Sequence, residues 1–361
     1  MPKIIHAADF HLDSAFAGLE PEKARTRRGE LRELPDRLAE LVLAERVELV
    51  LLSGDLFDSE RVYPETVEAL RRALERMACP VFIAPGNHDP CTARSPYRTE
   101  KWPDNVHIFQ DTALAEKVLP SLDCVVHGAA FSSTERADQV LEGFSVPQDG
   151  RTHILCLHGD LLSNSSRYGP ITREQLGRCG ADYAALGHVH QTSGLRREGA
   201  CFWAYPGCPE GRGFDELGDK GVLVGTVGPG RAEMKFVPLC RRRYHIVEAD
   251  VTGRDPRTAL ESALPPTAGD DLCRIIFTGE AGTIDLGLLA ASFQDRVYEL
   301  ELRDKTRPAQ SLWDRAGEDT LRGLFLQEMR YRYDTAPSEA ERDRVALAVR
   351  FGLAAIEGRD L

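Results

Sequence analysis

The sequence has no apolar run of the roughly 18 residues that a transmembrane helix needs, and its first residues do not have the layout of a signal peptide. Its nine Cys are scattered, odd in number and never spaced as CxxC. This pattern argues against a disulfide framework or a zinc knuckle. We therefore expect a cytoplasmic protein with reduced, buried thiols and no membrane partner.

Positive charge is also scarce. The 361 residues include 45 Lys and Arg against 57 Asp and Glu, for a net charge of −12 at pH 7. Phosphate contacts need Lys and Arg, so this balance argues against a free-standing, high-affinity nucleic-acid binder. It does not exclude a nuclease, because a metal-binding cluster of carboxylates makes a chain acidic and a partner subunit can supply most of the grip on DNA.

The first 240 residues alternate short apolar runs with helical patterns, which predicts an α/β fold with a central sheet covered by helices. The helical spacing covers residues 21–45 and 63–78. The expected strands are 4–8, 47–52, 80–84, 123–130, 153–157, 183–186, 201–205, 221–227 and 234–239. We assign residues 1–240 to one catalytic domain.

The pattern changes near residue 241. Strands at 244–251, 272–277 and 297–302 with helices at 255–264 and 286–293 predict a small α+β domain over residues 241–306. Two further helices, 311–332 and 338–357, make residues 307–361 a C-terminal helical segment. These helices either bind a partner or cover the core of the second domain.

Five polar segments each follow an apolar, strand-like run, so we expect a single sheet to bring them to one edge. They carry the residues expected to bind metal: Asp9, His11, Asp55, Asn87, His158, His188 and His190. Carboxylates, imidazoles and an amide oxygen suit Mn²⁺, Fe²⁺ or Zn²⁺ better than Ca²⁺. The segments would thus form a transition-metal site.

Spacing suggests roles within the site. Asp9 and His11 are two residues apart, so at a strand end they would point the same way and bind one ion, and His188 and His190 repeat that spacing. Two ions bridged by one Asp such as Asp55 would activate a water for phosphoryl displacement. His88 beside them is placed to protonate a leaving oxygen. Asp89 would orient the His88 imidazole.

In order, these segments read D-x-H, G-D-x-x-D, G-N-H-D, a later H and G-H-x-H. They resemble the motifs of the calcineurin-like metallophosphoesterase superfamily. The resemblance implies a β-sandwich flanked by helices, two divalent metal ions and hydrolysis of phosphoesters.

Residues 6–16 and the segment 205–221 are similar to SbcD-type DNA repair exonucleases, especially their YhaO-like bacterial branch. That resemblance implies one metal held by Asp9, His11, Asp55 and His190. It implies a second held by Asp55, Asn87, His158 and His188, with His88 as the catalytic histidine. Manganese is expected first, with iron, zinc or magnesium as alternatives. Asp58 stands where some nuclease relatives have a second catalytic-region histidine, so we count it with His88 and Asp89 as catalytic, while cleavage polarity and rate are open.

The same resemblance implies DNA as substrate, an SbcC-like coiled-coil ATPase as partner, and a homodimer formed near residues 63–74 or 90–102. Arg241, Arg242 and Arg243 are either a phosphate contact or a solvated linker. Two other functions stay open: a phosphodiesterase or phosphatase for small nucleotides, and a non-catalytic scaffold. A non-catalytic scaffold usually loses metal ligands, and none of the expected ligands is missing from this sequence.

Overall fold

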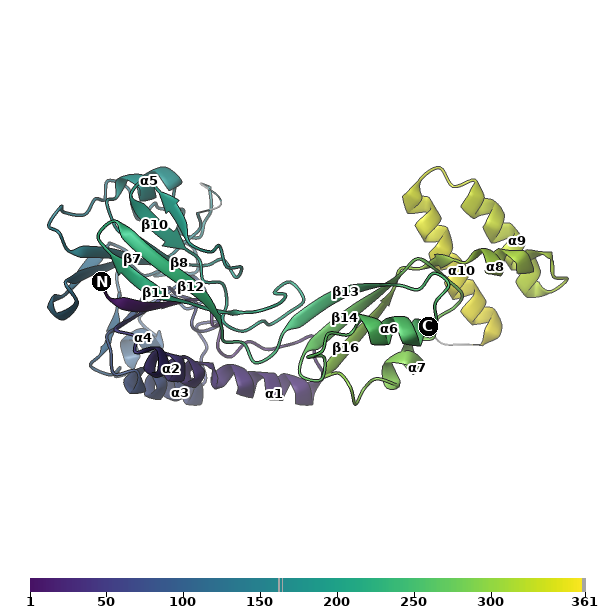
Figure 1. Cartoon of the computed structure of the whole chain (residues 1–361), viewed down its shortest axis with the longest axis horizontal. Coiled ribbons are helices and arrows are strands. Elements are labelled where there is room, and N and C mark those ends of the chain that lie inside the picture. The colour runs from purple at the N-terminus through teal and green to yellow at the C-terminus, as the bar shows by residue number, and fades with distance from the viewer. Residues whose placement is uncertain (162, 164, 359–361) are drawn as a thin grey trace. The chain divides into compact units, whose positions relative to one another are not determined.

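The computed structural model describes residues 1–161, 163 and 165–358 (Figure 1). The chain divides into two compact units, Met1–Arg241 and Arg242–Leu361, and each is described by itself below. The last three residues of the expected C-terminal segment lie outside the described part.

The first unit contains two six-stranded sheets, ordered β12-β11-β1-β2-β3-β4 and β5-β6-β7-β8-β10-β9. Their strands are β1 (Lys3–Ala7), β2 (Leu49–Leu52), β3 (Val81–Ile83), β4 (Val106–Ile108), β5 (Ala115–Leu119), β6 (Cys124–Gly128), β7 (Thr152–His158), β8 (Tyr183–Gly187), β9 (Arg196–Glu198), β10 (Cys201–Ala204), β11 (Gly221–Gly228) and β12 (Arg231–Pro238). The centre of each sheet is parallel: β1 to β4 in the first, and β6, β7, β8 and β10 in the second. The expectation of a single sheet is therefore wrong. The two-sheet sandwich agrees with the fold implied by the resemblance.

The sheets pack face to face because alternate residues of each strand point to opposite sides. Ile4 of β1 lies in a core with Ile154 and Tyr183 of the second sheet, whereas its neighbour Ile5 packs among residues of the helices. A third core forms on the far face of the second sheet, where Leu155 meets Leu176 of α5 (Arg173–Arg178). Strands buried on both faces explain the nearly continuous apolar runs in the sequence.

Apart from α5, the helices of the first unit cover the first sheet. They are α1 (Pro21–Arg32), α2 (Leu34–Glu45), α3 (Pro64–Arg76) and the short α4 (Pro96–Thr99), and a 3-10 turn η1 (Pro120–Leu122) precedes β6. The helical pattern over residues 21–45 is two helices rather than one. Pro35 has no N–H to donate within a helix, and it lies in the first turn of α2, where none is needed.

The carboxyl ends of β2 and β8 approach closely where the two sheets meet. A Cβ on Gly187 would lie 1.8 Å from the carbonyl oxygen of Ser53, so only glycine fits there. The Ser53 hydroxyl also donates to the carbonyl of Ala185 at 2.9 Å. This contact brings the loops after β2 and β8 to one place.

The second unit is a small α+β fold followed by helices. A parallel sheet of order β13-β14-β16 is packed by α6 and α7, and α9 and α10 pack on each other through a core that includes Leu326, Val349 and Leu353. Its elements are β13 (Tyr244–Asp250), α6 (Pro256–Ala263), β14 (Leu272–Thr278), β15 (Glu280–Ala281), α7 (Leu286–Ala291), β16 (Glu299–Asp304), β17 (Arg307–Pro308), α8 (Gln310–Trp313), η2 (Asp314–Gly317), α9 (Leu321–Asp334) and α10 (Glu339–Glu357). Among the described residues, no helix has both the length and the apolar character needed to cross a membrane.

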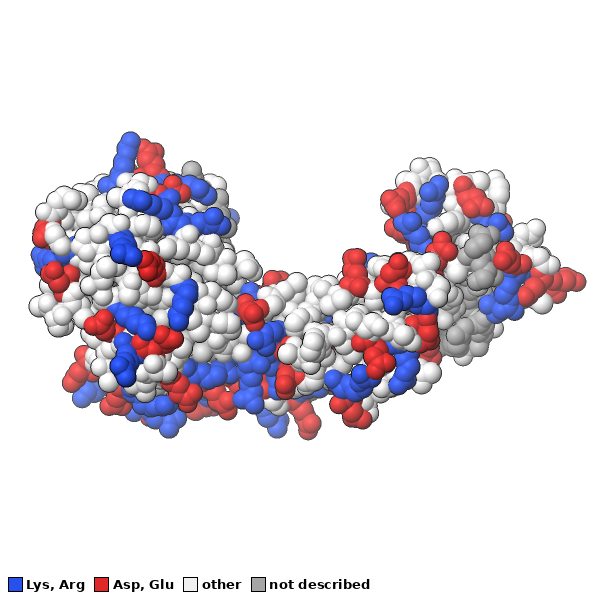
Figure 2. Space-filling view, viewed as in Figure 1, with Lys and Arg blue, Asp and Glu red and all other residues white. Residues whose placement is uncertain are grey.

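Charge is mixed on the face of the molecule that Figure 2 draws. Basic and acidic side chains lie interspersed there, and neither sign forms one broad field. Contacts with a charged ligand would therefore depend on a few placed residues rather than on a general attraction.

A buried ion network ties the loop after β10 to the first helices. Glu210 is 1% exposed and accepts from Arg27 at 2.8 Å, from Arg37 at 2.9 Å and from the backbone N–H of Arg241 at 2.7 Å. Arg27 is fully buried and also donates to Glu30 at 2.6 Å. A buried charge is tolerated only with such partners.

We predict that Glu210→Ala lowers the free energy of unfolding by about 3–5 kcal/mol, because Arg27 would be left buried without its main counter-ion. Urea unfolding of the full chain, followed by circular dichroism, measures the loss. Glu33→Ala is the matched control, since Glu33 is exposed and only meets Arg241 at 3.4 Å. Equal losses in both variants would contradict the role given to Glu210.

His6 connects the two sheets and should make stability depend on pH. Its ring nitrogens lie 2.9 Å from the Tyr183 hydroxyl and 3.2 Å from the Leu186 carbonyl, and burial lowers its pKa from 6.5 to about 3. The unfolded chain takes up this proton near pH 6.5, whereas the folded chain does so only near pH 3. The free energy of unfolding therefore falls as pH drops through this window, by about 1.4 kcal/mol per unit for this one group.

Replacing His6 by Gln, which keeps one donor and one acceptor, should flatten the fall in stability between pH 7 and pH 5. Urea unfolding at pH 7, 6 and 5 in metal-free buffer tests this. If the free energy of unfolding falls with pH equally in the wild type and in His6→Gln, other groups than His6 cause the loss of stability in acid.

Candidate metal centre

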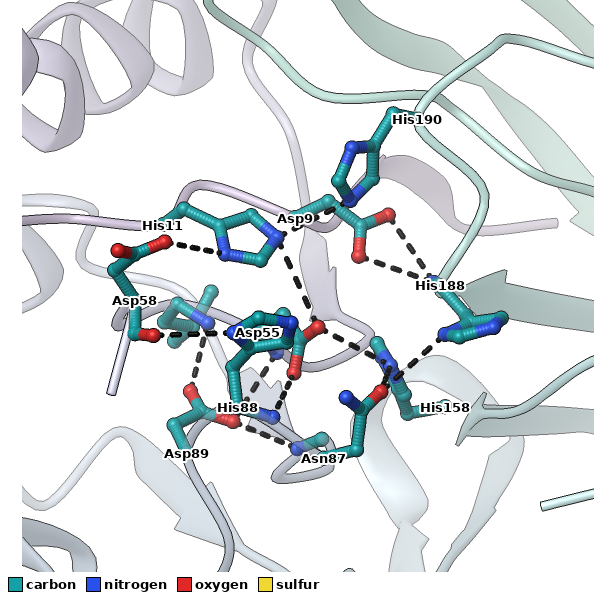
Figure 3. Close-up of polar contacts among 12 residues, drawn as sticks. Asp9, His11, Asp55, Asp58, Asn87, His88, Asp89, His158, His188 and His190 are labelled. Carbon is teal, nitrogen blue, oxygen red and sulfur yellow. Dashed lines mark hydrogen bonds and ion pairs between the residues drawn. The ribbon is translucent and has the colours of Figure 1, made fainter. Parts of the chain in front are cut away.

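All seven residues expected to bind metal lie together where the carboxyl ends of the two sheets meet (Figure 3). Asp9 and His11 follow β1, Asp55 follows β2, and Asn87 follows β3. His158 is the last residue of β7, and His188 and His190 follow β8. The first sheet thus contributes four of these side chains and the second sheet three.

The backbone at the centre is largely left-handed. The φ angles are 56° at Asp9, 47° at His11, 51° at Asp55 and 112° at His188. Asp9 and His11 are thus not at alternate positions of a strand, and that reason for their common direction is wrong. They are held instead by hydrogen bonds from their N–H groups to the carbonyls of Gly54 and Asp55, both 3.0 Å. Such conformations cost free energy and persist only where the surroundings impose them.

A first cluster joins Asp9, His11 and His190, whose ligand atoms lie within 4.8 Å of one another. The Nε2 atoms of His11 and His190 are 3.2 Å apart. The Asp9 carboxylate is fully buried and accepts from the backbone N–H of His188 at 3.0 and 3.1 Å. Burial, together with the Asp55 charge, raises the pKa of Asp9, so a cation beside it would relieve an unfavourable carboxylate.

A second cluster gathers around the Asn87 amide. Its Oδ1 lies 3.0 Å from Nε2 of His158 and 3.3 Å from Nδ1 of His188. Asp55 lies between the clusters, since its Oδ2 is 3.4 Å from Nε2 of His158 and 3.7 Å from Nε2 of His11. His188 and His190, expected from their spacing to face one ion, therefore face different clusters.

The hydrogen-bond partners of the Nδ1 atoms of His11 and His190 indicate which ring nitrogen carries the proton. Nδ1 of His11 lies 3.1 Å from Asp58 Oδ1, and Nδ1 of His190 lies 2.7 Å from Glu216 Oε1. Burial opposes ionisation of both carboxyls, but hydrogen bonds from these imidazoles and the nearby Arg212 outweigh it and lower the pKa of Asp58 and of Glu216. Ionised carboxylates only accept, so in the neutral tautomer that satisfies these contacts each Nδ1 carries the proton, although Arg212 Nη2 also lies 3.1 Å from Nδ1 of His190.

It follows that the two facing Nε2 atoms of His11 and His190 are both acceptors. The same holds for His158, whose Nδ1 donates to the Ser53 carbonyl at 2.9 Å and whose Nε2 faces acceptor oxygens. Acceptors in contact with acceptors repel each other unless a cation lies between them. The donor set therefore fits divalent metal ions, with neutral imidazoles whose other nitrogen is held by a carboxylate or carbonyl.

His88 and Asp89, which we expected to be catalytic, have surroundings that differ from each other. His88 is exposed, and its Nδ1 lies 3.1 Å from the carbonyl of Asp58, while its backbone N–H donates to Asp55 at 2.9 Å. The expectation that Asp89 orients this ring is wrong. Asp89 is buried and accepts from the backbone N–H groups of Leu56 at 2.7 Å and Gly86 at 2.8 Å and from the Tyr97 hydroxyl at 2.6 Å. Asp89 thus fastens the loops after β2 and β3 together.

Arg212 and Glu216 were not assigned a role from the sequence, although both lie in the segment 205–221 that resembles nucleases. Arg212 donates to Glu216 at 2.7 Å and to Asp58 at 3.2 Å. One guanidinium thus connects the two carboxylates that hold the histidines of the first cluster. Their place in that segment was the sequence evidence that Arg212 and Glu216 have a role. No local sequence pattern, however, pairs them with His11 and His190.

The profile of the calcineurin-like phosphoesterase family matches residues 2–192, more than half of the chain. The chain belongs to this family. Its members hydrolyse phosphoesters and bind two divalent metal ions, which agrees with the paired clusters.

Each of the following three relatives is at most 29% identical to this chain over the matched residues. The chain is 29% identical over 335 residues to the uncharacterized metallophosphoesterase YhaO of Bacillus subtilis, covering 84% of this chain and 81% of that protein. It is 26% identical over 275 residues to the DNA double-strand break repair protein Mre11 of Aeropyrum pernix (70% and 64% covered). It is 25% identical over 275 residues to one of the subunits of the nuclease SbcCD of Bacillus subtilis (63% and 67% covered).

We predict that Glu216→Ala weakens metal binding by about 10- to 100-fold, because His190 would lose the acceptor that fixes its proton on Nδ1. Calorimetric titration of the metal-stripped protein with Mn²⁺ measures the affinity directly. Asp215→Ala removes an exposed carboxylate from the same loop and should leave the affinity unchanged. A weakened Asp215 variant beside an unaffected Glu216 variant would refute this role.

Proposed function

We propose that this protein is a two-metal phosphodiesterase that cuts DNA, as the nuclease subunit of a complex with an SbcC-like coiled-coil ATPase. The observation that carries the proposal is the pair of acceptor clusters sharing Asp55, with the exposed His88 imidazole beside them. Relatives named for double-strand break repair and for the SbcCD nuclease favour DNA over other phosphodiesters.

In this proposal Asp9, His11, Asp55 and His190 hold one ion. Asp55, Asn87, His158 and His188 hold the other, and the position of Asp55 between the clusters supports its use by both. Manganese is the expected metal, since imidazole, carboxylate and amide donors without thiolates suit it, and iron, zinc or magnesium are alternatives.

When bound, a pair of ions in such a site supplies an activated water and neutralises charge on the reacting phosphate. The protein positions that chemistry. The Asp58 carbonyl holds Nδ1 of His88 and so leaves Nε2 free to reach a substrate oxygen. As an imidazolium, protonated on both ring nitrogens, His88 can then donate its Nε2 proton to the leaving oxygen, or a hydrogen bond to the phosphate, from a fixed direction. Asp89 keeps the two loops that carry Asp55 and His88 in register.

Asp58 has a positioning role in this scheme. Its carboxylate accepts from His11 Nδ1 at 3.1 Å and from Arg212 at 3.2 Å, so it orients a metal ligand. A carboxylate occupied in this way would not contact the reacting phosphate. Its carbonyl, in contrast, acts through His88.

The partner, dimer and location remain proposals of the same kind. Leu324 and Tyr331 on α9 and Phe351 on α10 are exposed apolar residues, which favours contact of these helices with another protein such as the ATPase. A homodimer through residues 63–74 or 90–102, and a cytoplasmic location, stay predictions from the resemblance.

A paired assay tests the function. Purified protein with Mn²⁺ should cut both a labelled linear duplex DNA and bis-p-nitrophenyl phosphate, and a chelator should abolish both activities. His88→Ala should lower kcat on both substrates by about 100- to 10,000-fold while metal binding is retained, because the proton donor is lost and the ligands are not.

His107→Gln is the matched control, since that imidazole lies on β4 against Phe82 and Phe109. Hydrolysis of the small ester alone, even after the ATPase partner is added, would favour a small-nucleotide phosphodiesterase. Bound metal without either activity would favour the scaffold.

A further inference from the structure

A groove of about 720 Å³ opens from the metal centre. Asn87 and His88 line it, and among the lining side chains that the metal chemistry does not use are Arg61, Arg94 and Tyr168. The groove is much larger than a single phosphate group requires. Its other residues therefore face parts of a substrate beyond the reacting phosphate.

The two arginines belong to the loops that build the centre. Arg61 is three residues after Asp58 in the loop following β2, and Arg94 is six residues after His88 in the loop following β3. Both backbones are anchored nearby. The Arg61 N–H donates to Ser59 Oγ at 3.2 Å, and the N–H of Cys91 donates to the Phe131 carbonyl at 2.7 Å. Each guanidinium thus extends from a fixed loop.

Both guanidinium groups lack a counter-ion. In the described part of the chain, no hydrogen bond or ion pair engages the side chain of Arg61 or Arg94, and both residues are exposed. The carboxylates around them are mostly occupied: Glu135 pairs with Arg167 at 3.2 Å and Asp58 with His11 and Arg212. Within the described residues Glu60 has no such partner, so two uncommitted arginines face one uncommitted glutamate and the remaining charge of the groove is positive.

We propose that Arg61 and Arg94 bind backbone phosphates that flank the scissile bond of a polynucleotide, and so select a polymer over a small ester. This rests on the proposed nuclease function. A guanidinium presents a planar pair of donors that matches two phosphate oxygens. A substrate with only one phosphodiester has no second phosphate for these groups. In a chain of net charge −12, two uncommitted cations beside the centre are a significant part of its attraction for DNA.

The test uses the full-length protein and a labelled single-stranded dodecamer, beside the dinucleotide dTpT, which has one phosphodiester. With Mn²⁺, Arg61→Ala and Arg94→Ala should each raise KM for the dodecamer by about fivefold at 0.1 M salt. Each should also reduce the slope of log(kcat/KM) against log salt by about 0.7. The change in KM for dTpT should be clearly smaller, and Arg61→Lys should restore most of the salt slope but less of the KM.

Arg72→Ala is the matched control, because Arg72 is exposed on α3 and meets only Glu68, at 3.8 Å. If both groove variants behave like Arg72→Ala on the dodecamer while the wild type cuts it, the nuclease function stands and the arginine proposal is overturned. Equal losses on the dodecamer and dTpT would overturn it as well, because the arginines would then act on the scissile phosphate.

Failure of the function itself is separated by a binding measurement. Fluorescence anisotropy of the dodecamer is recorded with Ca²⁺ in place of Mn²⁺, for the wild type and both variants. If the wild type binds the dodecamer but never cuts it, the nuclease function fails, and the reduced salt slope of binding in the variants still decides the arginine proposal. If the wild type does not bind it at all, the arginine proposal falls, and the assay with the added ATPase partner decides the nuclease function.

Discussion

Where the two sheets meet, hydrogen-bond acceptors face one another without a proton between them. The Nε2 atoms of His11 and His190 lie 3.2 Å apart, and in the neutral rings the single proton is directed outward to a carboxylate. Nε2 of His158 likewise faces the oxygens of Asn87 and Asp55. Without a counter-charge this arrangement is repulsive and buried, so it strains the folded chain. Divalent ions between these acceptors would remove the repulsion, because the same atoms would then bind the ions. The left-handed backbone at these residues directs their side chains inward, which explains why such a conformation is kept.

The arrangement depends on groups that touch no metal. Arg212 donates to both Asp58 and Glu216, which accept from His11 and His190, so one guanidinium connects histidines that follow strands of different sheets. The Arg212 loop is in turn anchored by the buried Glu210 network, whose carboxylate also receives the backbone N–H of Arg241. Arg241 is the last residue of the first unit. The end of the first unit and His190, a proposed metal ligand, are thus connected through a short chain of ion pairs and backbone.

The sequence predicted the identity of the residues at the centre better than their arrangement. The motif residues follow apolar strands, and strand ends meet at an edge, so their convergence could be expected without a structure. Whether one sheet or two supplied them could not be read from local periodicity, because strands of separate sheets look alike in sequence. The role of Asp89 was misassigned since adjacency to His88 suggested contact, whereas its side chain turns to the backbone of the loop after β2. Glu216 acts on His190 across 26 residues, which no spacing rule predicts.

Under the proposed function, chemistry and selectivity have separate sources in this protein. The metal centre recognises features that all phosphodiesters share, so it cannot by itself distinguish DNA from a small ester. Selectivity must come from groups beyond the scissile phosphate. The mixed surface in Figure 2 offers no broad basic field on the face it shows, so long-range attraction is weak there and placed contacts weigh more. In such a chain a partner that grips DNA would raise the local concentration of substrate, while residues lining the groove beside His88 would decide which bond reaches the ions. Affinity and choice of bond would then be set by different parts of the complex.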